Sequence, residues 1–142
     1  MLALYANTIA TAVMVGVIWF VQVVHYPLLA QFGSTQSVAV AEQHQQRTGY
    51  VVGLPMLVEG VSTLWLLAQR PDGVAVLLPW ANAVLLAVAL GSTVLVSVPL
   101  HVKMALAHND ETGRRLVLTN WPRTIAWTAR LALCGVMLAQ LS

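Results

Sequence analysis

Apolar residues gather in four long blocks along the chain, and short polar connections separate the blocks. A hydrocarbon core of ~30 Å is crossed by about 20 mostly apolar helical residues. Each block is long enough, or nearly long enough, for one crossing. The pattern therefore predicts an all-α protein, an antiparallel four-helix transmembrane bundle that forms a single integral membrane domain over residues 1–142. Its helices are expected at about 2–32, 50–69, 74–107 and 121–141.

The connections divide the molecule into two sides. The terminal side holds both chain ends and the turn signal Pro71-Asp72-Gly73, which joins the second and third helices as a hairpin. The distal side holds the other two connections. In the first, residues 38–48 are predicted to form a short interfacial helix or ordered loop that ends at Gly49. In the second, residues 108–115 are predicted to be a polar loop, after which Asn120 can cap the fourth helix.

Composition and charge agree with a membrane protein and give it an orientation. Hydrophobic residues make up 58% and charged residues 8% of the chain, against about 25% charged in soluble proteins. Arg70 is the one cation on the terminal side. The positive-inside rule then places the distal side in the cytoplasm and both termini outside. The expected location is the inner (plasma) membrane of a bacterium. The cations near the distal side are Arg47, Lys103, Arg114, Arg115 and Arg123.

The same composition narrows the partners. A net charge of +2 without a basic patch argues against nucleic acid. Cys134 is the only cysteine, so no intrachain disulfide can form. The expected partners are the lipid bilayer and a lipophilic small molecule, and a homo-oligomer is left open.

A Pro-Leu pair recurs near the distal side. The first helix ends in VVHYPLLAQ and the third in SVPLHVKMA, so each carries a Pro-Leu pair and a histidine. Proline kinks a helix and frees a carbonyl group. A kink at Pro99 could therefore aim the following turn, with His101, at the centre of the bundle. A duplicated hairpin would leave the same pattern.

Each predicted helix also carries one ionisable residue at a similar depth in the distal half. These residues lie roughly 10 Å from the ends of their helices at the α-helical rise. Such a group costs on the order of 3 kcal/mol inside a membrane, so it faces the interior and pairs. We therefore expect a shared interior site. Its members would be His25, Glu59, His101 and Arg130.

Two interpretations of this set remain open. Glu59 and Arg130 have opposite charges and could form only a structural ion pair, and each histidine could be neutral and bonded to a backbone carbonyl. Alternatively, imidazole and carboxylate ligands suit iron or copper, and two histidines on facing helices could ligate a haem. The predicted metal ligands are His25, His44, Glu59 and His101, with His44 reaching in from the distal segment.

The fourth helix adds residues for binding a substrate. Arg123, Trp127 and Arg130 are four and three positions apart and share one helix face. The two arginines could stabilise an anionic oxygen, while Trp127 stacks on an aromatic ring. Tyr26 could donate a proton. Asn120 and Trp121 complete the predicted substrate-binding set, and Trp121 could equally be an interfacial aromatic.

The motifs VPLHVKMAL and NWPRTIAWTARLA resemble those of the anthrone-oxygenase-like family of small four-helix membrane proteins. The resemblance implies oxidation of aromatic, membrane-soluble substrates, with roles for Pro99, His101, Trp121 and Arg123. This chain has His101 where the family motif has asparagine, and a histidine at this position favours metal or haem binding.

The sequence thus predicts a membrane oxidoreductase or oxygenase that acts on a lipophilic aromatic or quinone-like molecule, with iron or copper as the expected metal if it is metal-dependent. His101, Glu59, Arg123 and Arg130 are the predicted catalytic residues. The alternatives are a haem-binding electron-transfer subunit and a non-enzymatic membrane carrier or accessory subunit.

Overall fold

The computed structural model describes residues 1–29, 34–106 and 110–141, and these residues form helices with no strand among them. Two of the elements are short π-helical turns, labelled η1 and η2. The elements in chain order are α1 (Leu2–Phe20), η1 (Val21–His25), α2 (Tyr26–Leu29), α3 (Ser34–Ala68), α4 (Leu77–Ser92), η2 (Thr93–Ser97), α5 (Val98–Leu106), α6 (Asp110–Thr119) and α7 (Trp121–Ala139).

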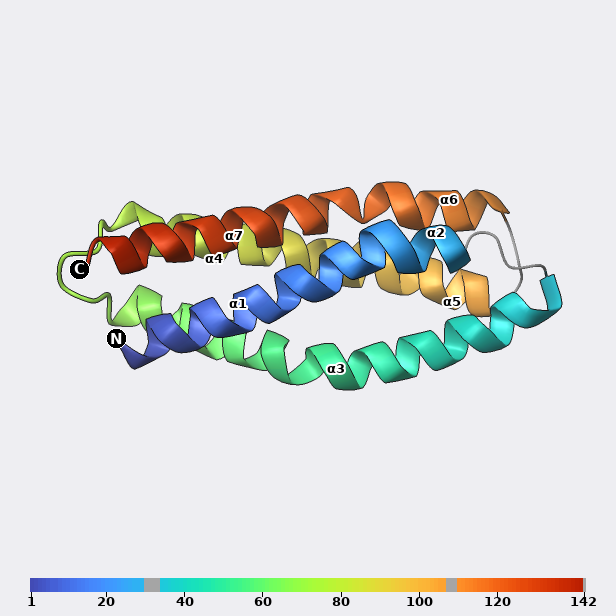
Figure 1. The fold of residues 1–142 in the computed structure, drawn as a ribbon, viewed down its shortest axis with the longest axis horizontal. Helices are drawn as coiled ribbons and strands as arrows, with labels where there is room; N and C mark the ends of the chain where they lie inside the picture. Colours follow the sequence, from blue (N-terminus) through green and yellow to red (C-terminus); the bar gives the residue numbers. More distant parts are fainter. Residues whose placement is uncertain (30–33, 107–109, 142) are drawn as a thin grey trace.

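The chain passes along the long axis of the molecule four times (Figure 1). Both termini lie at one end, together with the connection between α3 and α4. α2, α5, α6 and the start of α3 lie at the other, distal end. The predicted tight turn is present: the Val74 amide donates to the Pro71 carbonyl at 3.2 Å, and Gly73 has a φ of 91°. Glycine adopts this conformation without steric cost.

Three helical segments are long and apolar enough to cross a membrane, namely Leu2–Leu28, Gln46–Ala68 and Leu77–Lys103. The predicted fourth crossing, α7, is not among them. It opens with Trp-Pro-Arg-Thr and carries Arg130 near its middle, so it is less apolar than the other three.

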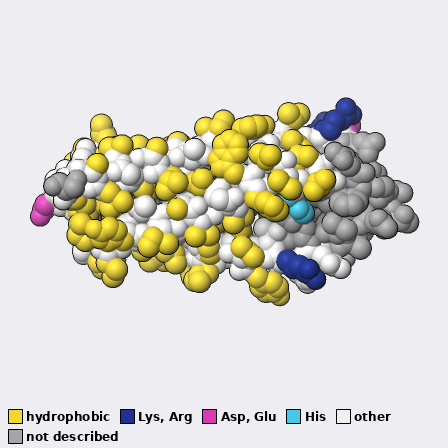
Figure 2. Space-filling view, viewed as in Figure 1, with side chains coloured by type: hydrophobic (Ala, Val, Ile, Leu, Met, Phe, Trp, Pro, Cys, Tyr) yellow, Lys and Arg dark blue, Asp and Glu magenta, His cyan; other side chains and the backbone are white. Residues whose placement is uncertain are grey.

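Apolar and polar side chains are distributed as in a membrane protein. Hydrophobic side chains cover much of the visible surface between the two ends (Figure 2), and Leu2 and Leu95 are 83% and 76% exposed. Polar side chains fill the interior instead. Those with no exposed surface are Asn7, Thr11, Glu59, Asn120, Thr124 and Arg130.

The second helix differs from the prediction. The interfacial segment 38–48 and the helix expected from residue 50 are one continuous helix, α3, which passes through Gly49 and Pro55. An interior glycine costs about 1 kcal/mol of helix stability, which is too little to end a helix when no turn or cap competes for the backbone.

The second distal connection also differs. From residue 110 onward, the predicted loop is the helix α6. Its Leu116 is buried in a cluster with Val21 and Tyr26, so packing on the first pass stabilises a helix that local sequence does not indicate. Asn120 has helical dihedral angles and its side chain does not cap α7. The predicted capping role is therefore wrong.

The two π-helical turns occupy equivalent places in the first and third passes. The Tyr26 amide donates to the Val21 carbonyl, and the Val98 amide donates to the Thr93 carbonyl. Both bonds join residues five apart, as in a π-helix. Each turn is followed, one residue later, by the proline of a recurring Pro-Leu pair. Because proline lacks an N–H, the α-helical bond pattern is interrupted there, and the wider turn accommodates the interruption.

Candidate functional site

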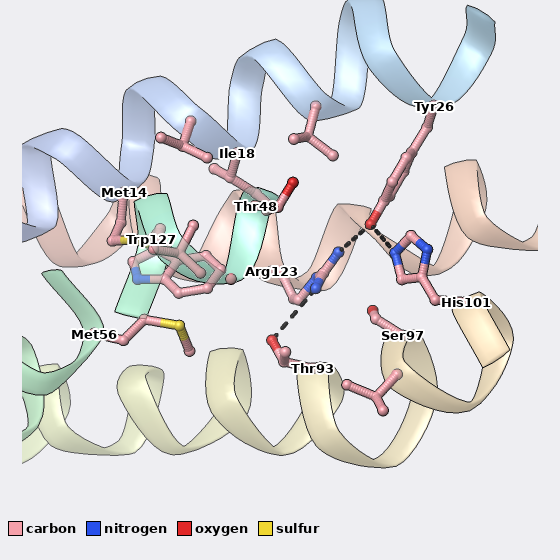
Figure 3. Close-up of a pocket in the computed structure, with 15 residues that line it drawn as sticks. Met14, Ile18, Tyr26, Thr48, Met56, Thr93, Ser97, His101, Arg123 and Trp127 are labelled. Carbon is pink, nitrogen blue, oxygen red and sulfur yellow. Dashed lines mark hydrogen bonds between the residues drawn. The ribbon is translucent and has the colours of Figure 1, made fainter. Parts of the chain in front are cut away.

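A cavity of about 180 Å³ lies between the passes in the distal half of the molecule (Figure 3). All four passes contribute to its wall. Most of the lining is apolar, and polar groups are concentrated toward one end. Single-turn π-helical segments in helices are frequent at functional sites, and both η1 and η2 contribute to this cavity through Val21, Thr93 and Ser97.

The polar end of the cavity is a chain of three side chains from three passes. The Tyr26 hydroxyl lies 2.8 Å from Nε2 of His101, and Nη2 of Arg123 donates to the same hydroxyl at 3.1 Å (Figure 3). All three residues line the cavity and are at least nine-tenths buried. This end can donate hydrogen bonds and offers a positive charge.

Arg123 is a buried cation without a counter-ion in the part of the chain that the structure describes. Its side chain is 6% exposed and forms no salt bridge with any described carboxylate. Its Nε has no hydrogen-bond partner among the described residues. A buried charge is costly unless it is paired and hydrogen-bonded, so this guanidinium favours a ligand that brings a negative or strongly accepting oxygen.

Neutral side chains hold Arg123 in place. Its Nη2 donates to Oδ1 of Asn120, and its Nη1 lies 3.4 Å from the Thr93 hydroxyl. The Asn120 amide in turn donates to Oε1 of Gln22 at 2.8 Å. Asn120 does not line the cavity, so its place in the structure is that of a residue that positions Arg123.

The other end of the cavity is apolar and aromatic. The Trp127 ring lies beside Met14 and Met56 (Figure 3), within a buried cluster that also includes Ile18. The indole Nε1 donates to Oε2 of Glu59 at 3.1 Å. Trp127 therefore forms part of the cavity wall and also reaches a second polar group outside the cavity.

That second group is centred on the ion pair of Glu59 and Arg130, both with no exposed side-chain surface. The predicted ion pair is thus present. The Thr11 hydroxyl also donates to Glu59, at 2.8 Å, and Nε of Arg130 donates to Oδ1 of Asn82 at 2.9 Å. Neither charged residue lines the cavity. Every charge in this group is paired, in contrast to Arg123.

The predicted site residues therefore divide into separate groups. His101, Arg123, Tyr26 and Trp127 meet at the cavity, whereas Glu59 and Arg130 pair behind Trp127. His25, Glu59, His101 and Arg130 were expected to share one interior point, but only His101 of the four lines the cavity. A similar depth along the helices does not bring side chains together, because the rotation of each helix about its axis decides which way a side chain points.

The remaining predicted residues lie outside the cavity lining. His25 lines a groove on the outer face between α1 and α3, and its ring centroid lies 6.1 Å from that of Tyr26. Trp121 is 41% exposed and packs edge-to-face on Trp19, with ring centroids 6.0 Å apart. The side chain of His44 is outside the described part of the structure.

The predicted metal ligands do not assemble within the described residues. No group of three or more His, Cys, Asp or Glu side chains there could hold a metal ion. Glu59 is occupied by Arg130, Trp127 and Thr11. A haem macrocycle also exceeds a cavity of about 180 Å³, since an aromatic ring the size of benzene alone occupies a cavity of roughly 150 Å³.

Sequence reasoning missed several residues of the site. Thr93 and Ser97 enter the cavity wall through η2, and Thr48 lines it from the part of α3 that was expected to be a separate segment. Of these three residues, Ser97 alone had a signal in the sequence, because it lies one helical turn before His101. Asn7 and Asn82, which bond to the ion-pair group, had no sequence signal beyond being amides within apolar helices.

Comparison with known proteins gives no relative: no protein-family model, curated protein or solved structure matches this chain. The resemblance of the two motifs to the anthrone-oxygenase-like family stays a prediction.

Proposed function

We propose that this chain is an integral membrane protein that binds a lipophilic aromatic or quinone-like molecule in the cavity beside Trp127. The observation that carries the proposal is Arg123, a buried cation facing the cavity with no carboxylate partner among the described residues. An oxygen on the ligand ring would accept from Arg123 and from the Tyr26–His101 pair. The ring would lie against Trp127, in the apolar part of the cavity.

The size of the cavity sets the size of the ring system. A cavity of roughly 150 Å³ binds benzene, and this one measures about 180 Å³. It therefore fits one substituted six-membered ring. A substrate of three fused rings, as the family resemblance implies, would require the passes to move apart.

We also propose that the four passes form an antiparallel transmembrane bundle with both termini outside and the cavity toward the cytoplasm. The apolar surface, three helices of spanning length and the buried polar interior support this arrangement. Described cations lie near the distal end in Figure 2, as the positive-inside rule requires of a cytoplasmic side. The inner membrane of a bacterium remains the predicted location.

The polar end suits proton transfer to a ring oxygen. The Tyr26 hydroxyl and the His101 imidazole can exchange a proton with a bound phenol or quinone, and Arg123 can stabilise the charge on its oxygen. Proton exchange by itself changes no oxidation state. In the oxidoreductase or oxygenase proposal, reduction of a quinone would take two electrons from a separate reductant, and oxidation of a phenol would pass its electrons to a separate oxidant such as dioxygen. The described residues do not form a site for iron or copper, and the cavity is too small for haem. The alternative function, a non-enzymatic carrier, would bind the molecule in the same cavity and release it chemically unchanged.

Replacing Tyr26 with phenylalanine tests the site. We expect the purified wild-type protein to bind decylubiquinone saturably, measured as quenching of tryptophan fluorescence, with the quenching reduced in Trp127→Phe. Tyr26→Phe removes the hydroxyl that aligns Arg123 and His101, so binding should weaken roughly 5- to 10-fold, the value of one hydrogen bond.

Tyr5→Phe is the matched control, since Tyr5 is 49% exposed on the same pass and does not line the cavity. It should bind like the wild type. Unsaturable quenching in the wild type, or equal binding by Tyr26→Phe, would contradict the proposal.

A further inference from the structure

A groove on the outer face of the molecule adjoins the cavity. It has a volume of about 380 Å³ and lies between α1, η1 and α3, and Gly16, Phe20 and Val51 are among its lining residues. Val17, Val21 and Thr48 line both the groove and the cavity. Only these three side chains are shared, so they form the partition between the two spaces.

The partition consists of small side chains, two valines and one threonine. Gly16 lies beside it on the groove side, where an added Cβ atom would meet nothing within 4 Å. In Figure 1, α3 diverges from α1 toward the distal end. We call the place that Val17, Val21 and Thr48 occupy the gap between α1 and α3.

The groove lies on two segments of spanning length, at the distal end of each. Its lining residues fall within 16–25 of Leu2–Leu28 and 47–51 of Gln46–Ala68. Its mouth would therefore face the part of the bilayer where the acyl chains meet the headgroups. His25 and Arg47 also line it, and the aliphatic stem of an arginine can cover apolar surface while its charged head reaches the interface. An apolar chain can lie here without crossing a buried charge.

Resting on the proposed function, we infer that the ligand is a single-ring phenol or quinone with an alkyl or isoprenoid chain, whose ring occupies the cavity and whose chain leaves through the gap between α1 and α3. The cavity is too small for ring and chain together. A molecule of this shape resides in the bilayer and would enter sideways by the same gap. The chain adds little affinity, because lipid tails are as apolar as the groove; the requirement is that the gap accommodates it.

Filling the groove beside the gap should therefore discriminate between ligands. Gly16 lines the groove but not the cavity, and there is open space where its side chain would be. In Gly16→Phe we expect binding of decylubiquinone, which has a ten-carbon chain, to fall at least about tenfold, because the new ring occupies the groove. Binding of duroquinone, a chain-free ring, should change less than about threefold on the same scale. Gly16→Leu should show a smaller loss in the same direction, and Gly16→Ala should retain both ligands.

Val84→Phe is the control, because Val84 is 61% exposed on α4 and lines neither space. It should leave both affinities unchanged, and thermal unfolding of each variant reports whether it is folded. If folded Gly16→Phe and Gly16→Leu bind decylubiquinone as well as the wild type does, the alkyl chain does not use this gap and the inference is wrong, while the cavity proposal stands. If the wild type binds neither quinone, the proposed function itself fails.

Discussion

Replacement of Glu59 by alanine is expected to destabilise the protein by about 3 to 5 kcal/mol, the usual cost of removing one member of a buried ion pair. Arg130 would be left charged, with no exposed surface and without its carboxylate. The Thr11 hydroxyl and the Trp127 indole would also lose their acceptor. The free energy of unfolding of the purified protein in detergent measures the loss.

The exposed pair of Glu111 and Arg115 is the matched control. These residues are four apart on α6, and their side chains are 62% and 65% exposed. Glu111→Ala should therefore cost less than about 1 kcal/mol. A double replacement, Glu59→Leu with Arg130→Met, should recover most of the stability, because an apolar pair replaces a desolvated ionic one. Equal effects of Glu59→Ala and Glu111→Ala would contradict this prediction, because the buried pair would then contribute no more to stability than an exposed one.

Replacement of Arg123 by leucine is expected to have the opposite signature, a large loss of binding with little loss of stability. Removing a hydrogen bond from a charged group costs about 1.5 to 3 kcal/mol, so the affinity for decylubiquinone should fall roughly 10- to 150-fold. The folded protein loses bonds to Tyr26 and Asn120 but also loses a buried charge that lacks a described counter-ion. These effects offset each other, and unfolding should change by less than about 1 kcal/mol.

Arg123→Lys separates charge from geometry, because lysine keeps the charge but not the planar fork of donors. Its binding should be intermediate. Arg114→Leu, which removes an exposed arginine of α6, should bind like the wild type. Arg123→Leu with wild-type affinity would remove the observation on which the proposed function rests.

Some features of the site could be predicted because they depend on local sequence. The spacing of Arg123, Trp127 and Arg130 placed all three on one face of α7, and all three are buried. The pairing of Glu59 with Arg130 was available as an alternative, because their charges and depths match. The hydrogen bond between His101 and Tyr26 could not be predicted from the sequence. Both residues follow a π-helical turn, η1 or η2, and such a turn changes the direction in which the following side chains point.

The two wrong predictions of local structure, the loop at 110–115 and the cap at Asn120, also arose because contacts with distant parts of the chain decide these features. Residues 110–115 read as a polar loop because their own sequence is rich in charge, yet α6 forms because Leu116 packs beside Val21 and Tyr26. Asn120 was expected to cap a helix, the usual role of its side chain before a helical run. In the structure it bonds to Arg123, one helical turn further along the chain, and to Gln22 of the first pass, which is far away in the sequence.

The sequence by itself determined that the chain is helical, that it is built of long apolar segments, and that ionisable side chains lie within them. It predicted four membrane-spanning helices, of which three are long and apolar enough in the structure. These properties follow from the transfer free energy of each side chain and from helical periodicity, which act over a few residues. Only the tertiary structure decided that Glu59 neutralises Arg130 while Arg123 faces a cavity. That outcome depends on how each helix is rotated about its axis, which the packing of all the passes sets together.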